Sequence, residues 1–186
     1  MIKQPEITDA TRNNFIQAFC ELYETKPIEK ITVKEVAERA GYSRTTFYNY
    51  FKDVYDLLQY IEDSFISQLM NIITTTIKED ITLDNFILSF TKAVNVSETY
   101  RLILFKNPYS TQFVQRLKEK ITPVFLEVFG ISPDNTKAIY TFEFYIPGIV
   151  SVFSRWIQNE NEMSVDNLAI LIKSILQDGF LAQLDD

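Results

Sequence analysis

The segment from Ile31 to Lys52 constrains the fold more than any other part of the chain. Its sequence, ITVKEVAERAGYSRTTFYNYFK, predicts a short helix, a glycine turn and a second helix. Ala37 is small enough for close helix packing, Gly41 can adopt the positive φ that ends a helix, and Phe47 can fill the core. This spacing is typical of a helix-turn-helix, in which the second helix enters the major groove of DNA.

Capping residues mark the start of both predicted helices. Thr32 with Glu35 three residues later has the pattern of a capping box, and Ser43 can cap the second helix. Since Phe47 faces inward, the opposite side of the second helix faces outward. The outward positions are Arg44, Thr45, Tyr48 and Asn49. A helix, a glycine and another helix occur in many small helical proteins, but here the caps, the turn, the core spacing and the polar outer face agree.

The run from Ile31 to Asp53, with the amphipathic helix before it and the DLL sequence after it, resembles the N-terminal domain of tetracycline-repressor-like (TetR family) transcription regulators. The resemblance covers about residues 8–61 and implies a recognition helix that begins at Ser43. The family positions that usually touch bases or phosphates correspond to Thr45, Thr46, Tyr48, Asn49, Tyr50 and Lys52. Val54 stands where the family commonly has a lysine that contacts a phosphate.

The candidate DNA contacts divide into base and phosphate contacts. Arg44 can bond a guanine edge with two hydrogen bonds, and Asn49 can pair with adenine. Tyr50 suits a phosphate contact, and packing against neighbouring helices is an equal alternative for it. The predicted DNA-binding residues are Thr32, Lys34, Ser43, Arg44, Thr45, Thr46, Tyr48, Asn49, Tyr50 and Lys52.

The formal net charge of −7 is unexpected for a protein that binds DNA. The acidic excess lies mostly after residue 60, whereas the first 60 residues are nearly balanced and carry basic side chains around the predicted helix-turn-helix. A local basic face is enough for phosphate contacts. We therefore expect DNA binding that weakens quickly as salt rises.

Several function classes are disfavoured by what the sequence lacks. The chain has no His, and its one cysteine, Cys20, lies in an apolar helical pattern. A Gly-rich phosphate loop and a metal-ligand cluster are also missing, so the sequence predicts neither catalysis nor a cofactor. It contains no apolar run long enough for a bilayer and no signal-peptide pattern, which predicts a cytoplasmic protein without a membrane contact.

Rare glycines and recurring helical spacing predict an all-α protein of about nine helices. We expect a three-helix head over residues 1–53, beginning with a helix from about Thr8 or Asp9 to Lys26, and a helical body for effector binding and dimerisation over residues 54–186. A long helix from Val54 to about Lys78 would link them. The other helices are expected at 83–96, 98–105, 111–129, 134–158 and 165–184, with Pro123 and Pro147 bending two of them.

The last two predicted helices are more apolar than one small domain needs. The resemblance implies that they pair with a second copy in a four-helix bundle, and a dimer would let two heads read a palindromic operator. The alternative is an ordinary core, because apolar periodicity does not distinguish a partner from the chain itself. The predicted seam consists of Gly148, Ile149, Phe153, Trp156, Leu168, Ile172 and Ile175.

The body is rich in aromatic residues with a few polar ones among them, which suits an apolar ligand pocket. Core packing is the favoured alternative for each, and Glu143, if interior, would need Arg101 or a cationic ligand as its partner. The candidates are Phe86, Phe90, Arg101, Phe105, Tyr109, Phe113, Phe125 and Glu143. The sequence thus predicts a ligand-responsive transcription regulator that a small apolar effector releases from its operator, and the family resemblance implies that it is a repressor. The alternative is a helical dimeric binding module, for small molecules or proteins, whose head has lost operator binding.

Overall fold

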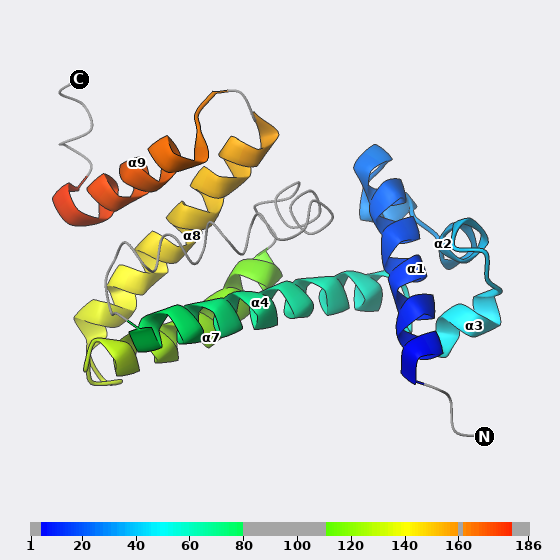
Figure 1. Ribbon diagram of the computed structural model, residues 1–186, viewed down its shortest axis with the longest axis horizontal. Coiled ribbons are helices and arrows are strands. Elements are labelled where there is room, and N and C mark those ends of the chain that lie inside the picture. The colour runs from blue at the N-terminus through cyan, green and yellow to red at the C-terminus, as the bar shows by residue number, and fades with distance from the viewer. Residues whose placement is uncertain (1–4, 80–110, 160–161, 180–186) are drawn as a thin grey trace. The chain divides into compact units, whose positions relative to one another are not determined.

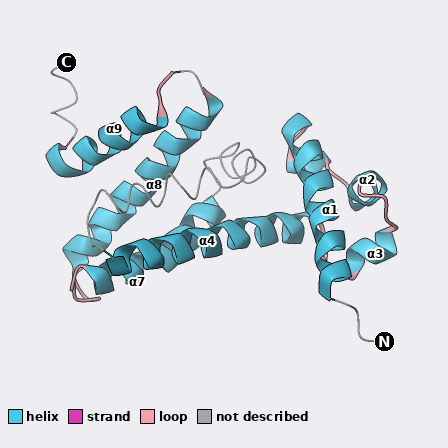
Figure 2. Ribbon diagram, viewed as in Figure 1, coloured by secondary structure: helices cyan, strands magenta, loops and turns pink. Residues whose placement is uncertain are grey.

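The computed structural model describes residues 5–79, 111–159 and 162–179, and these segments form helices joined by short loops (Figure 1). No strand occurs in them (Figure 2), which confirms the all-α prediction. The helices are α1 (Pro5–Thr25), the 3-10 helix η1 (Ile28–Lys30), α2 (Val33–Arg39), α3 (Arg44–Tyr48), α4 (Val54–Glu79), α7 (Thr111–Val128), α8 (Thr136–Gln158) and α9 (Val165–Asp178). The helices expected at 83–96 and 98–105 lie outside the described residues.

The chain divides into two compact units, Met1–Ser64 and Phe65–Asp186. The division falls inside α4, later than the boundary at residue 53 expected from the sequence. We call the first unit the head and the second the body. The first turns of α4 therefore belong to the head, and its later turns belong to the body.

The head is a three-helix unit in which α2 packs against both α1 and α3. Its core consists of aromatic and small side chains with almost no exposed surface, because α1 and α3 each present one apolar face. The most buried are Phe15, Phe19, Val36, Ala37, Phe47, Leu57 and Ile61. Leu57 and Ile61 come from the first turns of α4, which explains why the head extends past Asp53.

The body is built on one apolar cluster shared by α4, α7, α8 and α9. From α4 the cluster takes Phe65, Leu69 and Ile73 at helical spacing, and from α8 it takes Val150 and Phe153. Pro123 and Pro147 both lie within their helices, which continue on either side of them. Among the described helices, none combines the length and the apolar content that a bilayer crossing requires.

Three helix boundaries differ from those expected. The first helix begins at Pro5, before the predicted start at Thr8 or Asp9. The second helix of the helix-turn-helix ends at Tyr48, so Tyr50 and Lys52 lie beyond it. The last helix ends at Asp178 rather than near residue 184, because Gly179 takes a φ of 84° and its amide donates a hydrogen bond to the carbonyl of Ile175.

Candidate functional site

The turn between α2 and α3 is a glycine cap with two backbone hydrogen bonds. Gly41 has a φ of 78°, the left-handed region that favours glycine. Its amide donates to the carbonyl of Glu38 over 3.2 Å, and the amide of Tyr42 donates to the carbonyl of Ala37 over 2.9 Å. This pair of bonds satisfies the last carbonyls of α2 and sends the chain sharply into α3. The predicted role of Gly41 is confirmed.

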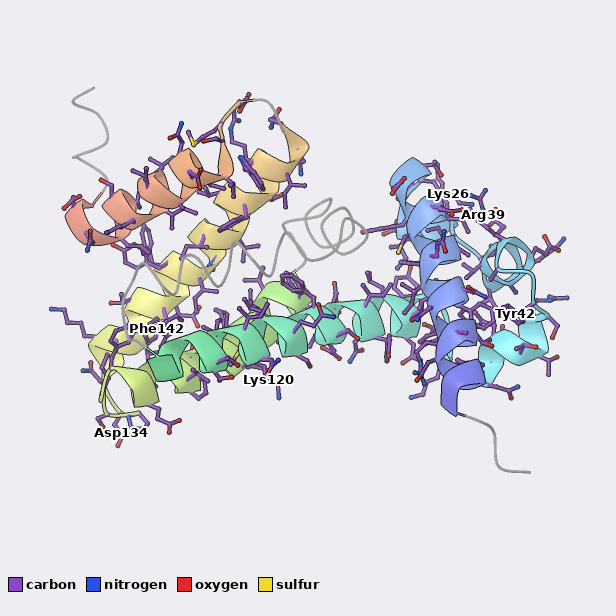
Figure 3. All side chains as sticks on the ribbon, in the orientation of Figure 1. Lys26, Arg39, Tyr42, Lys120, Asp134 and Phe142 are labelled. Carbon is purple, nitrogen blue, oxygen red and sulfur yellow. The ribbon has the colours of Figure 1, made fainter. Side chains whose placement is uncertain are left out.

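Tyr42 ties this turn to α1. Its ring centroid lies 5.2 Å from that of Phe15, and its hydroxyl accepts a hydrogen bond of 3.2 Å from Nδ2 of Asn14. Hydrogen bonds with Thr11 and Asn14 lower the pKa of the Tyr42 phenol. Tyr42 is among the side chains labelled in Figure 3. The turn is therefore anchored by contacts outside the helix-turn-helix itself.

The predicted capping box at the start of α2 is present. The Thr32 amide donates to Oε2 of Glu35 over 3.0 Å, and the Glu35 amide donates to Oγ1 of Thr32 over 3.3 Å. Nζ of Lys26 lies 2.7 Å from Oε1 of Glu35 and so joins the end of α1 to α2. The hydrogen bonds from Lys26 and Thr32 lower the pKa of Glu35 to about 2. The Thr32 hydroxyl, a predicted DNA contact, also donates to Oε2 of Glu35.

A second ion pair joins α1 and α2 at the same end of the head. Nη1 of Arg39 lies 3.0 Å from Oε2 of Glu21. Figure 3 shows Lys26 and Arg39 together at this end of the head. Both side chains of the pair are about half exposed, so each bridge contributes little to stability by itself. Together the two pairs join α1 and α2 at one end of the head.

Ser43 caps α3 as expected. Its Oγ accepts a hydrogen bond of 3.1 Å from the Thr46 amide and lies 3.0 Å from Oγ1 of Thr46. The hydroxyls of two predicted DNA-binding residues are therefore paired with each other. Phe47, four residues after the cap, has no exposed surface, and its ring centroid lies 5.3 Å from that of Phe15 on α1. Burial of Phe47 fixes which side of α3 faces outward.

The outward side of α3 carries the residue set predicted from the spacing. Arg44, Thr45, Tyr48 and Asn49 are all exposed, and Tyr48 is 58% exposed. The Tyr48 ring meets Phe47 edge to face with centroids 5.9 Å apart, so the exposed ring also contacts the core of the head. We call these four residues the reading face. A guanidinium, a carboxamide, a hydroxyl and an aromatic ring are side-chain groups that can contact base edges in a major groove.

The other predicted DNA contacts lie around the reading face. Lys34 and Lys52 are exposed, and Lys34 lies 3.8 Å from Glu38 within α2. Tyr50 is half buried, and its ring packs against Phe15 with centroids 5.9 Å apart. Packing is therefore the observed environment of Tyr50, the alternative that the sequence left open.

Val54, where the resembled family commonly has lysine, is a buried residue at the start of α4. The start of this helix is capped by two aspartates. Oδ1 of Asp53 accepts hydrogen bonds of 2.8 Å from the amides of Tyr55 and Asp56, and Oδ2 of Asp56 accepts one of 2.9 Å from the Lys52 amide. Val54 therefore contributes packing to the head at a position where lysine would have offered a charge.

The body contains a cavity of about 260 Å³ between α7, α8 and α9. Its walls are almost wholly apolar, with hydroxyl groups only from one threonine and one tyrosine. The lining residues are Leu117, Ile121, Phe125, Phe129, Thr141, Phe142, Tyr145, Ile146, Ile149, Val150 and Leu176. No charged side chain is among these described wall residues, so the cavity suits a neutral apolar molecule.

Of the three predicted ligand contacts that the structure describes, one lines this cavity. Phe125 lines it, whereas Phe113 is buried in the core beside Phe65 and does not. Glu143 lies at the surface rather than in the interior, and its Oε2 accepts a hydrogen bond of 2.5 Å from Nζ of Lys118. The remaining candidates, Phe86, Phe90, Arg101, Phe105 and Tyr109, lie outside the described residues.

Sequence reasoning missed the α8 wall of the cavity. Phe142, Tyr145, Ile146 and Val150 share one side of that helix at spacings of three and four, a signal present in the sequence. Ile149, also on this wall, was assigned to the dimer seam instead. The apolar content of α8 reflects a cavity wall as well as a core.

The residues of the predicted dimer seam differ in their burial. Phe153, Leu168 and Ile172 are buried in the core of their own chain. Trp156 is half buried and donates its ring N–H to the carbonyl of Met163 over 2.7 Å. Ile149 and Ile175 are also half buried, and Gly148 is exposed. The large apolar side chains that α8 and α9 expose are Ile139, Tyr140, Phe144 and Ile170.

Within the part of the chain that the structure describes, no group of three His, Cys, Asp or Glu residues could hold a metal ion. Cys20 is buried in the head, and burial raises the pKa of its thiol to about 12. The described residues offer two features that suit binding of another molecule. They are the reading face of α3 and the apolar cavity of the body.

Comparison with known proteins connects these features to a family. Residues 7–61 match the family model described as bacterial regulatory proteins, tetR family. The chain is similar in fold to the fatty acid degradation regulator FadR from Bacillus halodurans, with a TM-score of 0.69, 13% identity, and coverage of 95% of this chain and 96% of that one. No curated protein matches it in sequence.

Two further solved structures share the fold. A TetR-like transcriptional regulator from Rhodococcus sp. RHA1 has a TM-score of 0.61 and 17% identity, and covers 92% of this chain and 96% of its own. The dihydroxyacetone kinase operon activator DhaS has a TM-score of 0.55 and 19% identity, with coverage of 93% and 95%. The helix-turn-helix with its exposed reading face lies within residues 7–61, the segment that is similar to the tetR family of bacterial regulatory proteins, and the chain shares its all-helical fold with these solved structures.

Proposed function

We propose that the protein is a ligand-responsive transcription regulator that binds a palindromic operator as a homodimer and is released from it by a small apolar effector. The reading face is the observation that carries this proposal. Arg44, Thr45, Tyr48 and Asn49 are exposed together on α3, while burial of Phe47 fixes the orientation of the helix. An exposed polar and aromatic helix face on a rigid three-helix unit is suited to direct readout of DNA.

Within the reading face, Arg44 is proposed to bond a guanine edge and Asn49 an adenine edge. Lys34 and Lys52 flank the face with exposed ammonium groups, which suits contacts with phosphates. Thr46 and Ser43 remain candidates for the phosphate backbone, although their hydroxyls bond to each other in the free protein. Binding should weaken steeply with salt, because each neutralised phosphate releases counterions.

A homodimer follows from the requirement for specificity. One short recognition helix contacts only a few base pairs, and a two-fold axis would place two of them on a palindrome. The exposed apolar side chains of α8 and α9, with Tyr140 73% and Phe144 75% exposed, supply surface that a second copy can cover. We therefore place the proposed seam on this outer surface, around Gly148, rather than on the buried Phe153 and Leu168.

The effector is proposed to enter the cavity of the body. Apolar walls and a volume of about 260 Å³ favour a small neutral molecule over a large or charged one. Leu69 and Ile73 of α4 belong to the same apolar cluster as the cavity wall residues Ile121 and Val150. Leu57 of the same helix is buried in the head. A ligand that repositions the later turns of α4 would therefore disturb the head, and ligand and operator would oppose each other.

Binding of the head to an operator could repress or activate transcription. One protein of the same fold, DhaS, is an operon activator, so the fold does not by itself make a repressor. Repression is proposed from the family resemblance of the head. In the alternative, the head no longer binds an operator and the chain serves as a helical dimeric binding module. The acidic net charge of −7 and the buried Val54 are the observations that favour this alternative.

The deciding experiment is selection from random duplex DNA with the full chain, followed by electrophoretic shift of the enriched sequence at two salt concentrations. An Arg44→Ala/Tyr48→Ala double variant removes two side chains of the reading face. Gln17→Ala, which removes an exposed polar side chain of α1 outside the helix-turn-helix, is the control. Molecular mass in solution is measured for each protein, so that loss of the dimer is not mistaken for loss of DNA recognition by the reading face.

A regulator should enrich a palindrome, and the double variant should lose the shift while it keeps its mass and fold. The control should bind as the unchanged chain does. Absence of any enriched sequence from a folded dimer would overturn the proposal in favour of a binding module. With the operator in hand, the same shift assay screens neutral apolar compounds for release, and DNA upstream of the protein's own coding region is the first natural target to test.

A further inference from the structure

Arg12 of α1 is a basic residue of the head whose charge faces aromatic rings. Its guanidinium carbon lies 5.9 Å from the ring centroid of Tyr50 and 5.4 Å from that of Tyr60. Both distances are within the range in which a cation is attracted to a ring face. Tyr50 follows α3, and Tyr60 lies on α4. A single side chain of α1 therefore contacts both the α3–α4 connection and α4 itself.

The two rings belong to a series of aromatic contacts that ends at the reading face. The Tyr60 ring meets Phe51 edge to face with centroids 5.6 Å apart, and Phe51 lies 5.6 Å from Phe47. Phe47 in turn meets Tyr48 at 5.9 Å. The amide of Tyr50 donates to the carbonyl of Phe47 over 2.9 Å, which ties its backbone to the end of α3. The position of α4 is thus linked to that of Tyr48 through rings in direct contact.

The surroundings of Arg12 do not resemble those of a phosphate-binding arginine. Its Nη1 lies 2.8 Å from Oδ1 of Asp9, and its side chain is 30% exposed. It lines a pocket of about 290 Å³ whose other walls include Asp56 and Asp63. Carboxylates on this side of the guanidinium would repel a phosphate. Its aromatic and acidic neighbours indicate a role inside the head.

We propose that Arg12 is a positioning residue for DNA reading, which holds Tyr50 and Tyr60 together and so fixes α3 between α1 and the first turns of α4. This inference rests on the proposed function and concerns how the head keeps its reading arrangement. Without Arg12, a smaller fraction of molecules holds α3 in that arrangement. The apparent affinity for the operator falls in proportion to that fraction. Contact with two rings makes the expected loss about twofold to tenfold.

The test compares four variants of the full chain on two duplexes, the operator selected with the unchanged protein and a scrambled duplex of equal length. Arg12→Gln removes the cation, and Arg12→Lys keeps one. Tyr60→Leu removes the ring, and Tyr60→Phe keeps it. Dissociation constants are measured at several salt concentrations, and a thermal unfolding curve checks that each head is folded.

Arg12→Gln and Tyr60→Leu should each lower the ratio of operator to scrambled affinity by about twofold to tenfold, with an unchanged salt slope. Arg12→Lys and Tyr60→Phe should keep most of the ratio. If Arg12 and Tyr60 only stabilise the fold, their substitution should lower the unfolding temperature. The folded molecules should then keep the same ratio of operator to scrambled affinity. If Arg12→Gln does not fold, the Tyr60 pair carries the same comparison.

Two results would overturn the inference while leaving the proposed function intact. One is a salt slope reduced by about 1 in Arg12→Gln with equal weakening on both duplexes, which would identify a phosphate contact. The other is a ratio unchanged in both Arg12→Gln and Tyr60→Leu. Failure of the unchanged protein to select any sequence would instead overturn the proposed function, and the inference with it.

Discussion

The head and the body teach different lessons about what a sequence specifies. In the head, the predicted contacts join residues that are close along the chain, such as Thr32 with Glu35 and Ser43 with Thr46. In the body, the decisive question is which neighbour covers each apolar side chain, and in the described core those neighbours come from helices distant in sequence. Local rules of capping and turn formation therefore succeed in the head, whereas hydrophobic periodicity leaves the body ambiguous.

α3 and α8 illustrate the contrast. α3 has only five residues, and one buried side chain, Phe47, determines its outward face. α8 has 23 residues and apolar groups on several sides. Its side toward the core buries Phe153, a second side that includes Val150 lines the cavity, and Tyr140 and Phe144 are exposed. The same apolar composition thus serves three environments that the sequence pattern does not distinguish.

The largest effect is expected from Phe47→Ala, which tests whether one buried side chain orients α3 and its reading face. Loss of a fully buried ring should lower the free energy of unfolding of the head by about 3–5 kcal/mol, through lost burial and the cavity left behind. Denaturant unfolding followed by circular dichroism measures it. Tyr48→Ala, an exposed ring on the same helix, should change stability by less than about 0.5 kcal/mol. Similar losses in both variants would mean that α3 is not oriented by Phe47.

Gly41→Ala and Gly148→Ala compare a glycine whose conformation is required with one that is free of that requirement. At Gly41, with a φ of 78°, a side chain should cost about 1–2 kcal/mol although the added carbon meets nothing within 4 Å. At Gly148, within α8, alanine should stabilise the body by about 0.5–1 kcal/mol. Thermal unfolding measures both. A loss of dimer mass in Gly148→Ala would place this glycine in a close contact between copies.

Most of the head was predictable from residues alone, because its signals are local. The capping box, the glycine turn, the buried Phe47 and the start of α4 at Val54 all follow from side-chain chemistry within a few positions. The environment of Tyr50 was not decided by the sequence, since an amphipathic ring suits both packing and a phosphate. Its contact with Phe15 depends on how α1 crosses α3, which no local pattern encodes.

The functional surfaces of the body were less predictable. The cavity combines residues of α7, α8 and α9, and the prediction included Phe125 but not Phe142 or Tyr145. Glu143 was singled out because a carboxylate in an apolar run suggests an interior charge. The structure turns it outward to Lys118, since one side of the long helix still faces solvent. Tertiary packing, rather than composition, decides which of these positions meet a ligand.

Thr141→Phe tests whether the cavity is a binding site or incidental space. Thr141 lines the cavity and is exposed, so a larger side chain there can fill the opening with little strain on the core. We expect roughly tenfold weaker binding of a neutral apolar fluorescent dye, a change of about 1.4 kcal/mol in binding free energy. Fluorescence titration measures it. Thr136→Phe, exposed at the start of the same helix, is the control and should bind the dye as the unchanged chain does.

The smallest effect is expected at the capping box, where Glu35 links α2 to α1. Its pKa is lowered from 4.5 to about 2, first by the hydrogen bond from Lys26 and then by Thr32. A carboxylate whose pKa is lower in the folded state stabilises the protein above pH 4.5, and this contribution is lost as the pH falls through about 2. Glu35→Gln should therefore make stability fall less steeply with acid between those two pH values.

Denaturant unfolding at a series of pH values measures that slope. Glu38→Gln removes the same charge from the same helix at an exposed position and is the matched control. If Glu35 acts through its bonds to Lys26 and Thr32, only Glu35→Gln should flatten the slope, and Lys26→Met should flatten it in part because the Thr32 bonds remain. Equal slopes in the Glu35 and Glu38 variants would mean that Glu35 affects the pH dependence of stability only through its charge, and not through its bonds to Lys26 and Thr32. Buried side chains, rather than these local bonds, would then determine the geometry of the helix-turn-helix, as they do that of the body.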